Sequence, residues 1–564
     1  MRRRALIRPA WALGACLVLA AAPTPASGGP WVNVRSPHLI VVSDAGAGEA
    51  RRIAVRFEKI RAALKALWPW ARVDPPVPLT ILATRDEQGL KVLLPGYWEV
   101  KGRAQPAGVF MRGLARPWIA LRADLAEPSP GSDNPYSLIQ HEYVHLVVRL
   151  NFERVPPWLN EGVAELLGGT IVWGNGVALG RPIVRHLHLL RDRKLLPVEA
   201  LFLVDQHSPE YSEERRIGLF YAQSWALVHY LMLDPKASHD PRFKGFVSKV
   251  VEGMEPTAAL RAQGLNAAEL DRALESYVRQ LTYWQATLAT PIQAGDDFRT
   301  QEISLAEWSA ACGEFLVDSG RGSDGRRLLD QAERQQPDLA SVQEAMGLAL
   351  FREGRIAEAQ ERLERATRLD PLSPTAHVVA GLVTLQAATT IETRRDARGH
   401  LEKALQLAPE HALAHALLTE LLLADNEVQP ALEHAFRAAS LEPGSGRHRL
   451  SLARALAAVR RLADAEAQVQ KALDLGLDDS GREAARTLLQ SLSGLARKSD
   501  EPALPAGAVG TPSGISTASP VAGSATAPSG RATAWGVFVD ADGTARVMVR
   551  GDCVEIPLPP VRTT

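Results

Sequence analysis

His141-Glu142-Tyr143-Val144-His145 is the segment around which the chain can be interpreted. Histidines at positions i and i+4 lie on one face of a helix, so both imidazoles can reach a single zinc ion, with Glu142 beside them. A catalytic zinc needs three protein ligands and one open position, so two histidines are insufficient. The segment therefore predicts a metal centre whose third ligand lies elsewhere in the chain.

The third ligand is predicted 16 residues beyond His145, at Glu161 in the run Trp158-Leu-Asn-Glu-Gly-Val-Ala-Glu165. A helix–turn–helix of this length can fold back and place Glu161 opposite the histidines. Glu165 lies one helical turn further on the same face. It is predicted to accept the second ring N–H of a ligand histidine and so to fix its tautomer.

The two helices have recognisable boundaries. Asn134-Pro135 predicts the start of the first helix, with Asn134 as the capping residue and Pro135 at the first helical position. Val155-Pro156-Pro157 predicts the break between the two helices.

HEYVH followed by WLNEGVAE resembles the gluzincin metallopeptidases, in which a Glu on the next helix completes an HExxH site. The short spacing is similar to that of bacterial peptidase-MA-like proteins, which often carry tetratricopeptide repeats. The resemblance covers roughly residues 31–290 and is sharp only over 134–168. It implies an α+β catalytic domain, Zn²⁺ as cofactor and Glu142 as general base. The implied ligands are His141, His145 and Glu161.

Further roles follow from the same resemblance. The strand Trp118–Arg122 is expected at the edge of the sheet, where substrate would add as a further strand. Tyr221 is the predicted donor to the oxyanion, because it lies about as far beyond Glu161 as the corresponding tyrosine of the aminopeptidases. Tyr211 and His229 are the alternatives. The aminopeptidase Gly-x-Met-Glu-Asn segment is missing before His141, which favours an endopeptidase.

A 34-residue period runs through residues 306–479. Pro337 and Pro371 are 34 residues apart, as are Pro409 and Pro443, while the middle interval is 38. Small residues recur in the same phase, at Gly313, Gly347 and Gly381, at Ala332, Ala366, Ala404, Ala438 and Ala472, and at Ala359, Ala397, Ala431 and Ala465. This pattern predicts about five tetratricopeptide repeats and a solenoid that binds a protein partner. Residues 480–498 are predicted to form a capping helix.

The chain ends are predicted to differ from these two regions. Residues 1–28 have the layout of a secretory signal peptide, which predicts a periplasmic or extracellular protein, with lipidation at Cys16 as a weaker alternative. The catalytic domain is expected over 29–295. Residues 499–533 are a predicted disordered linker rich in Ala, Ser, Gly, Pro and Thr. Residues 534–564 predict a small β segment with one hairpin, which would dock elsewhere.

Composition excludes some function classes. Lys+Arg and Asp+Glu are equal at 64 each among 564 residues, so the chain has no net positive charge that would attract nucleic acid. Beyond the signal only Cys312 and Cys553 remain, too few for a thiolate zinc site, and Cys312 is expected to be a buried thiol of the first repeat. The basic residues between Arg51 and Lys65 are expected on a solvated helix face rather than a membrane-binding one.

The predicted function is therefore a zinc-dependent peptidase that acts on peptide or protein substrates. The alternative is a catalytically inactive peptidase-like scaffold that uses its repeats for envelope protein assembly. A hydrolase of another amide, such as a cell-wall peptide, is a third hypothesis.

Overall fold

The computed structural model describes residues 31–99, 106–126, 134–205, 208, 214–290, 292, 295 and 297–499, and three strands between 537 and 556. The predicted signal peptide, Cys16, Tyr211 and the predicted linker beyond Ser499 lie outside the described residues. Among the described helices, none is long and apolar enough to cross a membrane.

A six-stranded mixed sheet forms the centre of the N-terminal region, in the order β4-β5-β3-β2-β1-β9. The strands are β1 (Val32–Arg35), β2 (Leu39–Ser43), β3 (Leu79–Thr84), β4 (Gly108–Arg112), β5 (Pro117–Arg122) and β9 (Arg299–Glu302). Strands β2, β3 and β5 run parallel, and the other pairs are antiparallel. The prediction that Trp118–Arg122 is an edge strand is wrong, because β5 lies between β3 and β4. The strand at that edge of the sheet is β4, and β9 forms the other edge.

Helices cover both faces of this sheet. Successive residues of a strand point to opposite sides, so each strand contributes side chains to both layers. Ile81 and Ile119 join the core that includes α1 (Ala47–Leu67) and α4 (Ser137–Asn151). Leu82 and Trp118 face the other way, toward α2 (Glu87–Leu93) and α14 (Leu305–Asp318). The rings of Trp118 and Phe315 meet edge to face at 6.1 Å. The first helix of the repeat region is therefore also a layer on the sheet.

The prediction of a solvated basic face on α1 is wrong for two of its residues. Arg56 and Lys59 are buried at 3% and 6% exposure. The guanidinium of Arg56 lies 4.0 Å from the centre of the Tyr136 ring, and Lys59 donates to the carbonyl of Gly174. These side chains lie where α1 meets the start of α4 and the turn after residue 173.

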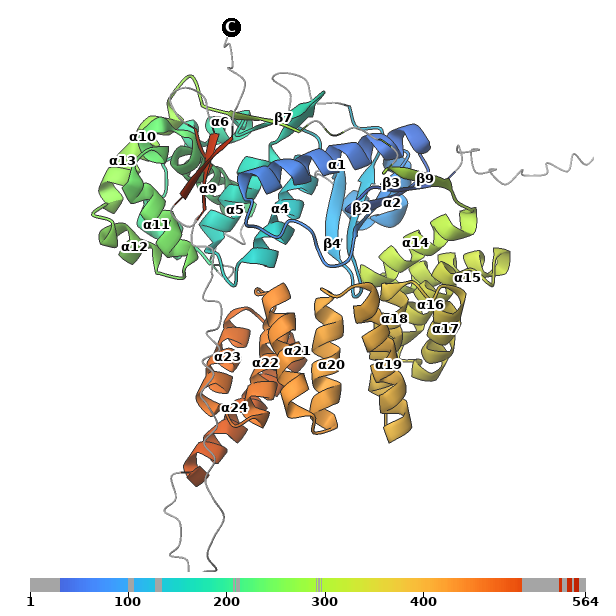
Figure 1. Ribbon diagram of the computed structural model, residues 1–564. Helices are drawn as coiled ribbons and strands as arrows, with labels where there is room; N and C mark the ends of the chain where they lie inside the picture. Colours follow the sequence, from blue (N-terminus) through green and yellow to red (C-terminus); the bar gives the residue numbers. More distant parts are fainter. Residues whose placement is uncertain are drawn as a thin grey trace, which may run out of the picture.

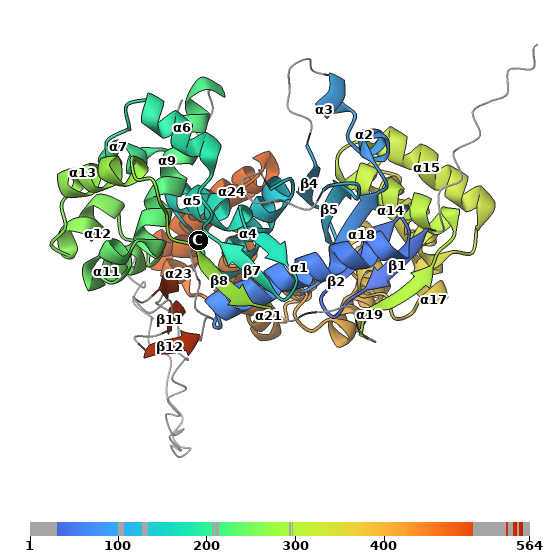
Figure 2. The same cartoon turned by 90° about the horizontal axis from the view of Figure 1, so that it is seen from above.

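Helices predominate between α4 and the repeats (Figures 1 and 2). In order they are α5 (Pro157–Gly168), α6 (Val184–Asp192), α7 (Val198–Leu203), α9 (Glu214–Leu233), α10 (Pro235–Ser238), α11 (Pro241–Val251), α12 (Pro256–Ala262) and α13 (Ala267–Val278). A second sheet pairs β6 (Ile171–Trp173), β7 (Gly176–Leu179) and β8 (Ala286–Ala289). A one-turn helix, α3 (Gly96–Glu99), follows α2.

The C-terminal region is a helical repeat array, as predicted. Over residues 305–474 it contains five consecutive helix pairs, followed by α24 (Asp479–Ser499). The pairs are α14 with α15 (Gly322–Gln335), α16 (Ala340–Arg352) with α17 (Ile356–Leu369), α18 (Pro374–Ala387) with α19 (Ile391–Leu407), α20 (Ala412–Ala424) with α21 (Val428–Leu441), and α22 (Gly446–Ala458) with α23 (Leu462–Asp474).

The recurring small residues allow the paired helices to approach closely. A Cβ at Gly313, Gly347 or Gly381 would lie 2.5–2.7 Å from a leucine side chain of the second helix of the same pair. The recurring alanines are also buried. The longer middle interval lengthens the second helix of the third pair, because α19 has 17 residues where α15, α17 and α21 have 14.

The turn between β4 and β5 inserts into the start of the repeat array. Ala115 belongs to the core cluster of the first three repeats. Next to it, the backbone N–H of Leu114 donates to Asp318 at 3.1 Å. Arg116 pairs with Glu314 at 3.0 Å and also with Glu344. The sheet and the repeats therefore share one interface, with Arg116 buried among several carboxylates.

The other end of the array contacts the connection between α4 and α5. Glu153 in that connection pairs with Arg449 at 3.2 Å and with Lys471 at 3.0 Å. Arg72 donates to the carbonyl of Leu441 at 2.7 Å. The array is consequently attached to the N-terminal region at both ends, which agrees with the position of α20 to α23 beneath α4 and α5 in Figure 1.

Two smaller predictions concern the cysteines and the C-terminal β segment. Cys312 is buried and free, as predicted, and it lies in the cluster where α14 covers the sheet. The predicted hairpin is present as β10 (Val537–Val539) and β11 (Ala545–Val549), and β12 (Asp552–Ile556) adds a third antiparallel strand. Strand β10 contacts α9 and α10.

Candidate metal centre

Helix α4 begins later than the sequence predicts, so the assignment of Asn134 as its capping residue is wrong. The helix starts at Ser137, and its N-cap position is Tyr136. Asn134 instead accepts from the backbone N–H of Tyr136 at 3.0 Å and donates to the carbonyl of Thr170 at 2.9 Å. This residue joins the start of α4 to the end of α5, since Thr170 follows that helix directly.

Two glycines allow α5 to pack tightly between its neighbours. A Cβ at Gly162 would lie 2.4 Å from the carbonyl oxygen of Ser224 on α9, and one at Gly168 would lie 3.1 Å from the Cβ of His141. Gly162 follows Glu161 directly, so the helix that carries Glu161 can approach α9 only because this position has no side chain. The glycine of the Asn-Glu-Gly segment therefore has a packing function.

Nitrogen and oxygen atoms of three side chains converge between α4 and α5. His141 Nε2 lies 2.9 Å from His145 Nε2, and each of these atoms lies 3.3 Å from Glu161 Oε2. Ligand atoms that bind one tetrahedral zinc at about 2.0–2.1 Å are separated by about 3.3 Å. Within the described residues, this is the only group of three such side chains that could hold a metal ion.

The second ring nitrogen of each histidine faces an oxygen atom of a side chain on α5. His145 Nδ1 lies 3.1 Å from Asn160 Oδ1, and His141 Nδ1 lies 3.5 Å from Glu165 Oε1. When both Nδ1 atoms carry the proton, both Nε2 atoms present lone pairs. Those lone pairs then face each other and a carboxylate at about 3 Å, an arrangement that requires a proton or a cation. The residues therefore fit a zinc ion.

The charges of the cluster are consistent with this requirement. Burial alone would raise the pKa of Glu161, but its hydrogen bonds and ion pairs with His141 and His145 lower that pKa to about 2. Burial opposes the charged form of His145, yet Glu161 and Glu142 raise its pKa. The site therefore combines a buried carboxylate with an imidazole that readily holds positive charge.

The predicted catalytic groups lie on the same helices or beside them. Glu142 follows His141 on α4 and is half-buried. The ring of Tyr221, on α9, lies 6.2 Å from the ring of His141. His229 lies elsewhere, in the core, where its ring nitrogens contact the hydroxyl of Tyr277 and the carbonyl of Gly180. Of the two predicted oxyanion donors that the structure describes, only Tyr221 is close to the cluster.

Sequence reasoning missed two residues of this arrangement. Asn160 stands in the motif directly before Glu161, and that place could have suggested a contact with a ligand. His186 forms a His-x-His with His188, a pattern that by itself indicates no site. In the structure, His186 Nε2 lies 2.9 Å from Glu165 Oε2. Burial raises the pKa of Glu165, but His186 foremost, then His141 and Arg185, lower it.

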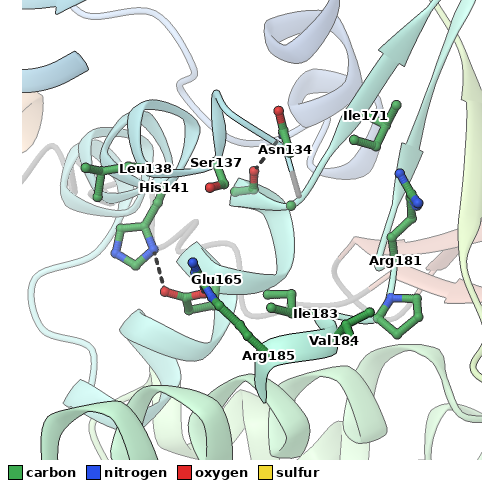
Figure 3. A pocket seen from close by; sticks show the side chains of 13 residues that line it. Asn134, Ser137, Leu138, His141, Glu165, Ile171, Arg181, Ile183, Val184 and Arg185 are labelled. Carbon is green, nitrogen blue, oxygen red and sulfur yellow. Dashed lines mark hydrogen bonds and ion pairs between the residues drawn. The ribbon is translucent and has the colours of Figure 1, made fainter. Parts of the chain in front are cut away.

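A cavity of about 250 Å³ opens beside His141. Its walls come from the start of α4, the end of α5 and the segment between β7 and α6 (Figure 3). The charged side chains that line it are Glu165, Arg181 and Arg185. The cavity therefore adjoins the cluster on the side of His141 that faces Glu165.

Comparisons with known proteins concern only a part of the chain. No protein-family model and no curated protein match it. Solved structures that match are the tetratricopeptide protein TTC0263 of Thermus thermophilus (20% identity, 33% of this chain and 99% of that one, TM-score 0.29), MamA (21%, 29% and 93%, 0.26) and PilF of Pseudomonas aeruginosa (17%, 34% and 92%, 0.29). TM-scores this low do not carry the assignment of the repeats. That assignment rests on the helix pairs and their close-packed glycines.

Proposed function

We propose that this chain is a zinc-dependent peptidase, an endopeptidase rather than an aminopeptidase. The observation that supports the proposal most is the approach of His141, His145 and Glu161, whose nearest ligand atoms all lie within 4.8 Å of one another. The Nδ1 contacts with Asn160 and Glu165 add to this support, because oriented imidazoles are typical of catalytic metal sites.

In the proposed reaction, His141, His145 and Glu161 would hold a zinc ion, which would supply Lewis-acid chemistry for the scissile carbonyl and for the attacking water. Glu142 takes a proton from the attacking water on its carboxylate and delivers it to the leaving amine. Tyr221 donates a hydrogen bond to the oxygen on which negative charge develops. Glu165 and Asn160 hold the two imidazoles in position.

Two features bear on the substrate. A strand-like peptide would pair with the edge strand β4 rather than with β5, and β4 lies against α4. The repeats are proposed to bind a protein partner through the surface that the 113–116 turn leaves uncovered. The expected place of action is the periplasm or the outside of the cell.

The test uses the purified full-length chain. Zinc is counted by mass spectrometry, and cleavage of a quenched, unfolded protein substrate is followed by fluorescence. The Glu142→Gln variant should keep one zinc per chain and lose about 10²–10⁴-fold in rate. Glu199→Gln, at an exposed glutamate of α7, is the matched control and should cleave normally. A chain without zinc, or equal rates for the wild type and Glu142→Gln, would contradict the proposal. Zinc without any cleavage would favour the inactive scaffold.

A further inference from the structure

The cavity beside His141 has a size and a position that suit one residue of a bound peptide. Its volume of about 250 Å³ is below the roughly 300–1,000 Å³ of pockets that hold a whole drug-sized ligand. One wall is His141, whose Nδ1 faces Glu165 of the same lining, so a side chain in this cavity would lie beside a candidate metal ligand. This inference rests on the proposed function.

The cavity combines an apolar lining with cationic side chains. Leu138, Ile171 and Ile183 offer contacts for a methylene stem. Arg181 and Arg185 lie on the segment that leaves β7 and enters α6. Figure 3 shows Arg185 reaching toward Glu165, while Arg181 lies on the opposite side of the cavity.

Glu165 is the single carboxylate in the lining, and its close contacts are with histidines rather than with these two arginines. Glu165 Oε2 lies 2.9 Å from His186 and its Oε1 lies 3.5 Å from His141. Arg185 is 3.9 Å from Glu165 Oε2, which is beyond hydrogen-bond distance. Among the described residues, that ion pair is the only one of Arg185, and Arg181 has none. Neither guanidinium group is therefore neutralised by a close ion pair at the cavity.

Guanidinium groups bind carboxylates through two parallel hydrogen bonds, which adds geometric selectivity to charge. We propose that this cavity is a specificity subsite for a substrate carboxylate, and that Arg181 and Arg185 recognise it. Two sources have this chemistry, namely an Asp or Glu side chain within the peptide and the free C-terminus of a peptide. In both cases the apolar lining holds the carbon atoms that precede the carboxylate.

The test measures binding rather than turnover, so that it does not depend on the peptidase proposal. Zinc-loaded Glu142→Gln protein is titrated with fluorescent peptides of eight residues that differ at one central position. One peptide carries Glu with an amidated C-terminus, the second carries Gln with an amidated C-terminus, and the third carries Gln with a free C-terminus. Tighter binding of the first or the third over the second identifies the source of the carboxylate.

We expect at least a tenfold preference for one of the carboxylate peptides over the Gln amide. In the Arg181→Gln/Arg185→Gln protein that preference should vanish, whereas binding of the Gln amide should change less than threefold. Arg193→Gln, at an exposed arginine directly after α6 and outside the cavity lining, controls for the general change of charge and should keep the preference. The Arg181→Glu substitution should lower the affinity for the preferred carboxylate peptide more than the affinity for the Gln amide.

Three results would overturn the subsite, namely equal affinity for the three peptides, no saturable binding of any peptide, or a preference that persists in the double variant. Failure of the peptidase proposal has a different signature. In that case the wild-type protein cleaves nothing, while the binding preference and its loss in the arginine variants are still observed.

Discussion

Glu165 and His186 lie 2.9 Å apart, although they belong to different helices, α5 and α6. The other oxygen of Glu165 faces Nδ1 of His141 at 3.5 Å. A chain of three side chains thus runs from the candidate metal ligand to a buried histidine 45 positions further along the sequence. Contacts of this kind orient a ligand imidazole and raise its basicity.

Replacement of Glu165 by Gln should therefore weaken zinc binding. The carboxylate loses its charge while its shape is kept, so we expect a roughly 10–100-fold lower affinity for zinc. The measurement is competition with a chelating dye at fixed pH. Glu269→Gln, at an exposed glutamate of α13, serves as the control. An unchanged affinity for Glu165→Gln would mean that its contact with His141 does not act on the metal.

Removal of the Tyr221 hydroxyl should affect turnover and leave zinc binding intact. If Tyr221 donates to the oxyanion, Tyr221→Phe lowers kcat by roughly 10²–10³-fold at similar KM. Tyr230→Phe, a buried tyrosine on the same helix, should lower kcat only slightly. Steady-state kinetics of both variants measure the effect. Similar kcat values for the two would contradict the role of Tyr221 as the oxyanion donor.

The shared interface between sheet and repeats should make stability depend on pH. Burial foremost, together with the charges of Glu344 and Asp318, raises the pKa of Glu314 to about 8 against the attraction of Arg116. Between about pH 4.5 and pH 8 the folded state then binds this proton more tightly than the unfolded state does, so stability falls as pH rises. Glu314→Gln removes this contribution.

Calorimetric melting at several pH values tests this dependence. The melting temperature of Glu314→Gln minus that of wild type should increase by a few degrees from about pH 5 to about pH 8. Glu358→Gln, an exposed glutamate of α17, should show no such increase. A difference for Glu314→Gln that stays constant over this range would refute the assignment.

Two glycine substitutions in the repeats should have opposite effects. In Gly347→Ala, the new Cβ would lie 2.5 Å from Leu363 Cγ, so we expect a loss of about 1–3 kcal/mol from overpacking. In Gly399→Ala, on α19, no atom lies within 4 Å of the new Cβ, and a gain of about 1 kcal/mol is expected from helix propensity. Denaturant unfolding of both proteins measures these changes, and a Gly347→Ala protein as stable as wild type would contradict the close-packing argument.

Local sequence patterns predicted part of the candidate site. The i, i+4 spacing of His141 and His145 depends only on helix geometry, and the distance to Glu161 suits one short connection. The contact of His186 could not be predicted in this way, because β6 and β7 lie between it and Glu165. Tertiary packing brings α6 to α5, and no local periodicity in the sequence predicts that contact.

The fold was predictable to a similar extent. The 34-residue period gives the helix pairs, because each pair repeats the same contacts. That period does not say what covers the outer side of the first pair, so the packing of α14 on the sheet could not be predicted. No pattern in Gly108–Arg112 indicates a strand, so the addition of β4 outside β5 could not be predicted.

The attachment of the repeat array at both ends has a consequence for how the molecule denatures. An array with a free end can fray one repeat at a time, since each repeat contacts only its neighbours. Here α14 packs on the sheet, and Lys471 of the fifth pair forms an ion pair with Glu153, two residues beyond α4. Loss of any single repeat would strain a closed ring that includes the HExxH helix. Heat or a mechanical pull should consequently disrupt the solenoid and α4 in one cooperative transition.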